Sequence, residues 1–250
     1  MNLVIYEHPL NEKLRSFMRV EHLFSQLASC RSFEHEFQHN GFFIALFALV
    51  ELLERSDVRN DLIKELEKNE SALVKWAQHP DICNDTLQQT LQKVVRLQER
   101  LHSKHKICSA LKEEPFLASL RQRFSIPGGH CSFDLPQLHY WQQLEKQQQK
   151  QQVESWMEHL NALEEAVYTV MTFVRERGQF GSLKAPEGFF QENTDDIELI
   201  RIQYTPAYGA FPTVSGNKYR YSIRFMQLSN ESDTGRANVT QDIMFSLAKC

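Results

Sequence analysis

The sequence contains no apolar run long enough to cross a membrane. The longest run, residues 42–50 (FFIALFALV), falls well short of the roughly 20 apolar residues that a transmembrane helix needs. The first residues also lack the basic segment followed by an apolar stretch that marks a secretory signal. We therefore expect a cytoplasmic protein without membrane insertion, in which residues 42–50 form a buried helix.

Cysteine spacings typical of a disulfide framework or a zinc site are also missing. The chain has five cysteines, an odd number, and no C-x-x-C pair. This pattern predicts reduced thiols, as in a cytoplasmic protein. The five are Cys30, Cys83, Cys108, Cys131 and Cys250.

Common nucleotide-binding and hydrolase motifs are absent too. The sequence has no Walker A motif, no G-x-G-x-x-G and no G-x-S-x-G elbow. It has no basic excess either, because 28 Lys and Arg stand against 32 Asp and Glu, and the net charge of −4 argues against a nucleic-acid-binding protein. A chain of 250 residues that is 42% hydrophobic can bury the core of one large domain or two smaller ones.

Apolar residues recur with helical spacing through the first two-thirds of the chain. Leu10, Leu14 and Phe17, for example, share one face of a predicted first helix. Further helices are predicted over 33–54, 58–78, 85–102, 116–124 and 135–144. The wholly polar segment 146–152 is either a flexible linker or the start of a helix. Because Gln and Lys are good helix formers, we expect one long helix from 146 to 177, ended by Gly178.

The pattern changes after Gly178. From Tyr219 to Phe225, apolar and polar residues alternate, which predicts a strand with one buried face. Residues 200–204 and 243–247 are similar, and residues 2–7 are a possible further strand that joins the same sheet. Segregated helices and strands predict an α+β protein, with a helical domain over 1–178 and a C-terminal antiparallel β-domain over 179–250.

A polar loop, SIPGGHCSFDLP (125–136), interrupts the helices. Pro127, Gly128 and Gly129 must break any helix. The loop is either a catalytic site built on His130 and Cys131 or a rigid joint. Neighbouring Cys and His rarely face one another, so we favour the joint, with Ser132 or Asp134 capping the next helix and Pro136 in its first turn.

Residues 35–39 (HEFQH) match the H-E-x-x-H motif of zinc peptidases. In such enzymes two histidines one turn apart bind zinc, and the glutamate activates water. The segment leads into an apolar helix, however, and no third ligand stands at a persuasive spacing. A zinc-dependent hydrolase that uses His35, Glu36 and His39 remains the alternative to a non-enzymatic, metal-free protein without a cofactor.

Several basic residues flank the polar loop or share a strand face. Arg121 and Arg123 precede the loop, His139 follows it, and Arg19 lies on the first predicted helix. Arg224 lies on the alternating strand, on the same face as Arg220. Such residues either bind an acidic peptide through charge-assisted hydrogen bonds or form a solvated, ion-paired surface.

Five segments together resemble the ZapD family of bacterial cell-division proteins. They lie in the same order along nearly the whole chain, and this ordered set is far more specific than a lone Pro-Gly-Gly. The segments are EHPLNEKLR (7–15), RQRFSIPGG (121–129), CSFDLP (131–136), GFFQEN (188–193) and SIRFM (222–226).

The resemblance implies a non-enzymatic function. ZapD-type proteins are cytoplasmic homodimers that bind the C-terminal tail of the tubulin-like FtsZ and crosslink its protofilaments at the mid-cell division ring. On this basis we expect FtsZ to be the partner, without nucleic acid. The expected tail site is a groove lined by Arg19, Arg121, Arg123, His139 and Arg224, with Pro127, Gly128, Gly129 and Asp134 shaping the adjacent loop.

Overall fold

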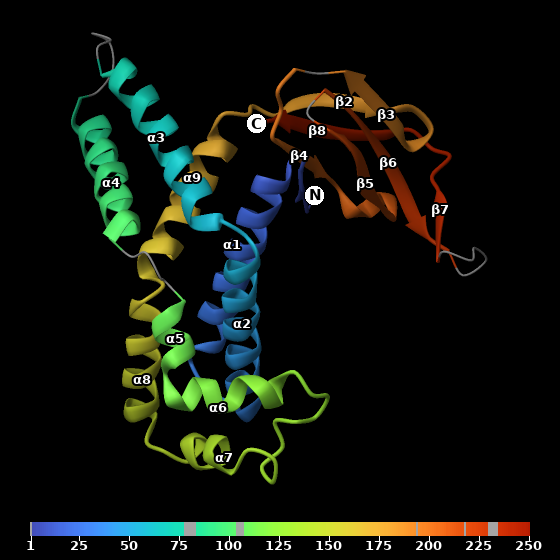
Figure 1. The fold of residues 1–250 in the computed structure, drawn as a ribbon. Helices are drawn as coiled ribbons and strands as arrows, with labels where there is room; N and C mark the ends of the chain where they lie inside the picture. The colour runs from blue at the N-terminus through green and yellow to red at the C-terminus, as the bar shows by residue number, and fades with distance from the viewer. Residues whose placement is uncertain (1, 78–83, 104–107, 194, 218, 230–234) are drawn as a thin grey trace. The chain divides into compact units, whose positions relative to one another are not determined.

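The computed structural model describes residues 2–77, 84–103, 108–193, 195–217, 219–229 and 235–250 (Figure 1). Helices occupy the N-terminal part and antiparallel strands the C-terminal part, which confirms the α+β class. Within this described part, no helix is both long and apolar enough to cross a membrane. The predicted end of the third helix, at Gln78, lies outside the described residues.

The chain divides into two compact units. The helical unit is Ser16–Val170, and the sheet unit combines Met1–Arg15 with Met171–Cys250. This division lies eight residues before the domain boundary expected at 178/179, and it places the first residues with the sheets. The helices are α1 (Glu12–Cys30), α2 (Glu36–Arg55), α3 (Val58–Trp76), α4 (Asn84–Ser103), α5 (Ser109–Glu113), α6 (Pro115–Phe124), α7 (Pro136–Gln142), α8 (Lys146–Glu158) and α9 (Asn161–Glu176).

The sheet unit contains two antiparallel sheets. One has the strand order β1-β4-β8-β2, and the other has the order β3-β6-β5 with β7 paired to β6. The strands are β1 (Val4–Pro9), β2 (Gly181–Ala185), β3 (Phe189–Asn193), β4 (Leu199–Tyr204), β5 (Ala210–Asn217), β6 (Arg220–Leu228), β7 (Arg236–Asn238) and β8 (Ile243–Lys249). The N-terminal strand β1 pairs with β4, from Val4 opposite Tyr204 to Pro9 opposite Leu199.

The core of the sheet unit lies between these sheets. On β6, Tyr221, Ile223 and Phe225 are buried, and Arg220 and Arg224 are exposed. This confirms the strand with one buried face that the alternating sequence predicts. The ring centroids of Phe225 and of Phe245, on β8 in the other sheet, lie 5.5 Å apart. The inward faces of the two sheets therefore form one apolar core.

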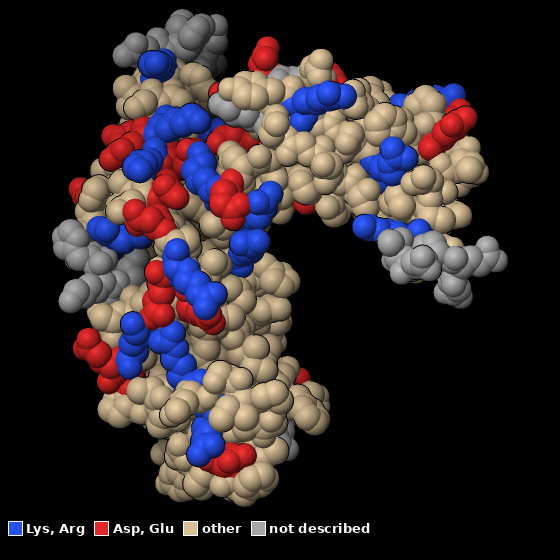
Figure 2. Space-filling view, turned by 45° about the vertical axis from the view of Figure 1, so that its right-hand side comes forward, with Lys and Arg blue, Asp and Glu red and all other residues tan. Residues whose placement is uncertain are grey.

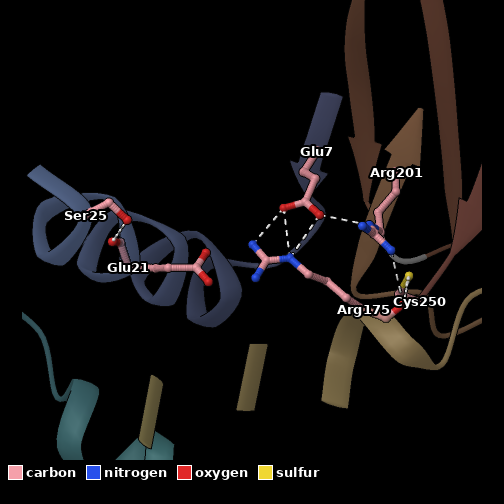
Figure 3. Close-up of polar contacts among 6 residues, drawn as sticks. All are labelled: Glu7, Glu21, Ser25, Arg175, Arg201 and Cys250. Carbon is pink, nitrogen blue, oxygen red and sulfur yellow. Dashed lines mark hydrogen bonds and ion pairs between the residues drawn. The ribbon is translucent and has the colours of Figure 1, made fainter. Parts of the chain in front are cut away.

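The half-buried carboxylate of Glu7 ties β1 to its neighbours in the sheet unit (Figure 3). Glu7 accepts hydrogen bonds from Arg175 Nη2 at 2.8 Å and from Arg201 Nε at 2.8 Å. Arg201 also donates to the carbonyl oxygen of Arg175, at 3.4 Å. Burial alone would raise the pKa of Glu7, but the hydrogen bonds and charges of the two arginines lower it below its usual value.

The helical unit packs around an aromatic cluster. The Phe43 ring on α2 lies 5.4–6.1 Å, between centroids, from four rings of α6, α7 and α8. These rings belong to Phe116, Phe124, Trp141 and Trp156. Contacts at these distances bury large apolar areas and favour edge-to-face geometry.

Gln149 on α8 connects this cluster to the end of α7. Its Nε2 donates to the carbonyl oxygens of Trp141, Gln142 and Leu144, at 3.0, 3.0 and 3.2 Å. The Trp141 carbonyl oxygen also accepts from the Leu144 N–H, at 3.2 Å. Its Oε1 lies 3.2 Å from Nε2 of the buried His39 on α2. A side chain in the middle of the polar segment 146–152 is thus a fully buried structural residue.

Two sequence predictions for this unit need correction. The single helix expected from 146 to 177 is two helices, because the chain turns at His159 and Leu160 between α8 and α9. Trp156, Leu160 and Leu163 are all buried, so the apolar stripe runs through the turn and its periodicity does not reveal the break. The 42–50 run is helical, but it is not wholly buried, since the Ile44 side chain is 53% exposed.

We predict that Glu7→Gln destabilises the protein by about 1–2 kcal/mol at neutral pH, because two arginines lose a charged acceptor. The pKa of Glu7 is lower in the folded protein than in the unfolded chain. Its contribution to the free energy of unfolding is therefore present above the usual carboxyl pKa and is lost as the pH falls below that value. Urea denaturation should therefore show that wild type and variant differ in free energy of unfolding at neutral pH and that this difference becomes smaller at acidic pH. Glu99→Gln, at an exposed position on α4, is the control. A difference in the free energy of unfolding that is the same at neutral and acidic pH would contradict the prediction.

Gln149→Leu should destabilise the helical unit by about 2–4 kcal/mol, because carbonyl oxygens at the end of α7 lose a donor and the His39 ring loses its contact with Gln149. Gln148→Leu, at an exposed position one residue earlier on the same helix, should have little effect. Thermal unfolding followed by circular dichroism compares the two. Equal melting temperatures for both variants would show that the Gln149 hydrogen bonds contribute no stability.

Candidate partner-binding site

The loop between α6 and α7 is built from consecutive turns. The backbone N–H groups of Gly129, Cys131 and Asp134 donate to the carbonyl oxygens of residues 126, 128 and 131, at 2.9, 3.2 and 3.0 Å. Gly128 has a φ of +72°, which favours glycine. A Cβ at Gly129 would lie 2.4 Å from the Arg123 carbonyl oxygen, so a side chain has no room there.

The expected side-chain cap of α7 is wrong. The N-cap residue is Leu135, and no side chain caps the helix; Pro136 is its first residue, as predicted. The Asp134 carboxylate instead lies 3.7 Å from Arg123 Nη1. Local capping rules missed this because the partner of Asp134 comes from the preceding helix rather than from the backbone that follows.

Arg121, at the end of α6, forms an ion pair within its own unit. Its Nη2 lies 2.9 Å from Glu54 Oε2 on α2, and Lys112 Nζ lies 2.7 Å from the other oxygen of the same carboxylate. Hydrogen bonds from Arg121 and Lys112 lower the pKa of Glu54 to about 2, so this carboxylate is ionised at neutral pH. An acidic ligand at Arg121 therefore has to share or replace Glu54.

Charged side chains of opposite sign also lie next to one another elsewhere on the helical unit. Figure 2 shows blue and red atoms interspersed over its upper and middle parts, whereas the lower part of the same face is mostly tan. The ion pair of Arg100 with Glu165 and that of Arg31 with Glu164 belong to this pattern. Positive and negative charges are therefore mixed over most of this surface.

The other predicted residues of the helical unit are accessible. Arg19 is exposed on α1, and His139 is exposed in the last turn of α7. Arg123 is also exposed, beside Asp134. The four helical-unit residues of the expected site thus come from α1, α6 and α7, while Arg224 belongs to the sheet unit.

Arg224 lies in the middle of the outer face of the β3-β6-β5 sheet. It is opposite Phe189 on β3 and Thr213 on β5, and its guanidinium carbon lies 4.8 Å from the centroid of the Phe189 ring. This cation–π contact holds the guanidinium on the sheet surface without neutralising it. Phe211 and Met226 form the next pair on the same face.

The outward strand positions around Arg224 contain arginines but no carboxylate. On the described strands, this outer face consists of Phe189, Gln191, Asn193, Arg220, Ser222, Arg224, Met226, Leu228, Phe211, Thr213, Ser215, Asn217, Arg236 and Asn238. Glu192 points to the other side, where it accepts a hydrogen bond from the buried Tyr221. The outer face thus differs in charge from the ion-paired helical surface.

The two histidines of the H-E-x-x-H segment have different surroundings. His35 is exposed just before α2, whereas His39 is buried and stacks on the Phe33 ring with 4.7 Å between centroids. The Nε2 of His39 is engaged with Gln149. Among the described residues, no group of three or more His, Cys, Asp and Glu side chains could hold a metal ion. These contacts give no support to the hydrolase alternative.

A cavity of about 770 Å³ in the helical unit borders Glu54 and Lys112. Its lining contains both signs of charge, including Asp57 and Arg59, so it favours neither an anion nor a cation. Cys108 also lines it, and burial raises the pKa of that thiol. The thiol is therefore protonated at neutral pH and is a poor nucleophile.

Sequence comparisons identify relatives over the whole chain. The profile of the ZapD family, described as a cell division protein, matches residues 18–224. Proteins named "Cell division protein ZapD" from Idiomarina loihiensis and Vibrio atlanticus are each 38% identical, over 99% and 98% of this chain and 96% and 98% of their own lengths. One from Shewanella sp. (strain MR-4) is 35% identical over the full length of both. This chain therefore belongs to the ZapD family of cell division proteins.

Proposed function

We propose that this protein is a non-enzymatic cell-division factor that binds the C-terminal tail of FtsZ. As a cytoplasmic homodimer at the mid-cell division site, it would crosslink FtsZ protofilaments and promote assembly of the division ring. Membership of a family of cell division proteins supports the cellular role. The choice of FtsZ as the partner follows from the sequence resemblance.

The outer face of the β3-β6-β5 sheet is the observation that carries this proposal. Arg224 presents its guanidinium there with Phe189 beneath it and no carboxylate on the described strand positions around it. A guanidinium binds a carboxylate through paired, charge-assisted hydrogen bonds. Phe211 and Met226 add apolar contacts one pair away. This surface suits a peptide that carries both acidic and apolar side chains.

The helical-unit residues Arg19, Arg121, Arg123 and His139 are further proposed contacts of the tail. Each lies at the surface, but Arg121 and Arg123 already face Glu54 and Asp134. Tail carboxylates would therefore share these guanidinium groups with Glu54 and Asp134 or compete with them. The contribution of Arg121 and Arg123 to tail affinity then depends on the strength of these internal ion pairs. Arginine can serve two acceptors because it has five N–H donors.

A dimer is required for crosslinking, because one chain with one tail site cannot bridge two filaments. A two-fold symmetric dimer presents two equal sites, and simultaneous binding to two filaments raises the effective affinity.

Co-sedimentation with FtsZ filaments tests the function directly. We expect the protein to pellet with full-length FtsZ and to bundle the filaments, and to do neither with FtsZ that lacks its C-terminal tail. The tailless protein controls for filament contacts outside the tail. Failure to pellet with full-length FtsZ would refute the proposal.

Charge reversal tests the proposed residues one at a time. Arg224→Glu, Arg19→Glu and Arg123→Glu should each weaken binding of a fluorescent FtsZ-tail peptide by about tenfold or more, because each replaces attraction by repulsion. The loss should be largest at low salt, where charges are least screened. Lys68→Glu, at an exposed position on α3, is the matched control. A folded variant with unchanged affinity removes its residue from the site.

Glu54→Gln should strengthen tail binding a few-fold, because it releases Arg121 and Lys112 from a competing carboxylate. Glu67→Gln, at an exposed position on α3, should leave the affinity unchanged. Anisotropy titrations with the same peptide compare the two variants. Equal affinities would show that Arg121 does not contact the tail.

A further inference from the structure

One groove on the helical unit departs from the mixed charge of its surroundings. It has a volume of about 320 Å³ and is lined by side chains of α4 and α9 that belong to Ser16–Val170. Three basic side chains and one acidic side chain line it, so it carries an excess of two positive charges in a protein of net charge −4. The polar lining residues are Gln89, Gln92, Lys93, Arg96 and Arg100 of α4 and Glu165 of α9.

The sequence of α4 places the basic groups in one row. Lys93, Arg96 and Arg100 follow one another at intervals of three and four residues, so they lie on the same face of the helix. The row spans about 10 Å, at a rise of about 1.5 Å per residue. Between Thr86 and Gln98 the helix contains no Asp or Glu. Side chains one turn apart in this row can therefore converge on the same anion.

Ion pairs within the chain compensate this row only in part. Arg100 Nη1 lies 2.6 Å from Glu165 Oε2, the one carboxylate of the lining. Lys93 and Arg96 are exposed, and neither forms an ion pair with any residue of the described part of the chain. Their charges thus remain accessible to a ligand, whereas those of Arg121 and Arg123 face internal carboxylates.

The number of hydrogen-bond donors favours phosphate over carboxylate. An arginine has five N–H donors, a lysine has three and a glutamine amide has two. Lys93, Arg96, Gln89 and Gln92 together offer more donors than the two oxygens of one carboxylate can accept. Linked phosphate groups present many acceptor oxygens and several negative charges, and arginine and lysine are the side chains that bind them.

We propose that this α4 groove binds a chain of linked phosphate groups, as found in inorganic tripolyphosphate and in nucleoside triphosphates. Lys93 and Arg96 bind the phosphate oxygens, Gln89 and Gln92 donate further hydrogen bonds from their amides, and Arg100 shares its guanidinium between the ligand and Glu165. The groove contains none of the residues proposed to contact the FtsZ tail, so this inference goes beyond the proposed function and does not depend on it.

Isothermal titration calorimetry of the full chain with sodium tripolyphosphate, in a phosphate-free buffer of low salt, tests the groove. Wild type should bind a single tripolyphosphate per chain, and more weakly as the salt concentration rises. Arg96→Glu and Lys93→Glu should each weaken binding by about tenfold or more, because each replaces attraction by repulsion. Lys150→Glu, at an exposed position on α8, is the matched control, since it changes the net charge equally outside the groove. It should bind like wild type.

A variant of the opposite sign distinguishes a site from a general effect of charge. Glu165→Gln removes the only carboxylate of the lining and releases Arg100, so it should strengthen tripolyphosphate binding a few-fold. Glu67→Gln, at an exposed position on α3, changes the net charge equally and should leave the affinity unchanged. Circular dichroism establishes that every variant is folded.

Titrations with ATP, GTP and a poly-glutamate peptide define the ligand class. Equal affinities for tripolyphosphate and the two nucleotides support a site for the phosphate chain alone, and tighter binding of a nucleotide supports a site that also contacts the base. Poly-glutamate that binds as tightly as tripolyphosphate would overturn the inference. So would a wild type that does not bind tripolyphosphate at low salt, folded Arg96→Glu and Lys93→Glu proteins that bind it like wild type, or an equal loss in Lys150→Glu.

Discussion

The sheet unit depends on the pairing of β1 with β4, which brings the first residues of the chain into a sheet formed otherwise by its last third. Glu7 secures this pairing because it accepts hydrogen bonds from Arg175 and Arg201 in a half-buried setting. The chain end takes part in the same region, since the Cys250 carbonyl oxygen accepts from the N–H groups of Glu198 and Leu199 at 2.9 and 3.0 Å. The other sheet, which carries Arg224 on β6, packs against this one through rings such as Phe225 and Phe245.

In the helical unit, apolar packing and a few buried polar groups act together. Phe43 and the surrounding rings form an apolar cluster, but rings alone do not fix the direction of a short helix such as α7. Gln149 does so by binding three carbonyl oxygens at the end of α7. Because a buried amide without partners is costly, this network specifies one arrangement of α7 against α8.

The two kinds of surface differ in how their charges are compensated. Arg121 and Arg123 face carboxylates of their own unit, whereas Arg224 rests on an aromatic ring and, within the described residues, no ion pair compensates its charge. A sequence reading treats these arginines alike, because residue type and exposure are similar. For recognition of an acidic peptide the difference matters, since an internal carboxylate must first be displaced or shared.

The sequence by itself determined the α+β class, the alternation on β6 and the helical positions of the first half, because periodicity is a local property of neighbouring residues. Its ordered motifs also indicated the ZapD family. Only the tertiary structure decided that Gln149 is buried, that Asp134 faces Arg123 rather than capping α7, and that Ile44 is exposed within an apolar run. Each of these depends on which distant segment lies beside the residue, and periodicity carries no information about that.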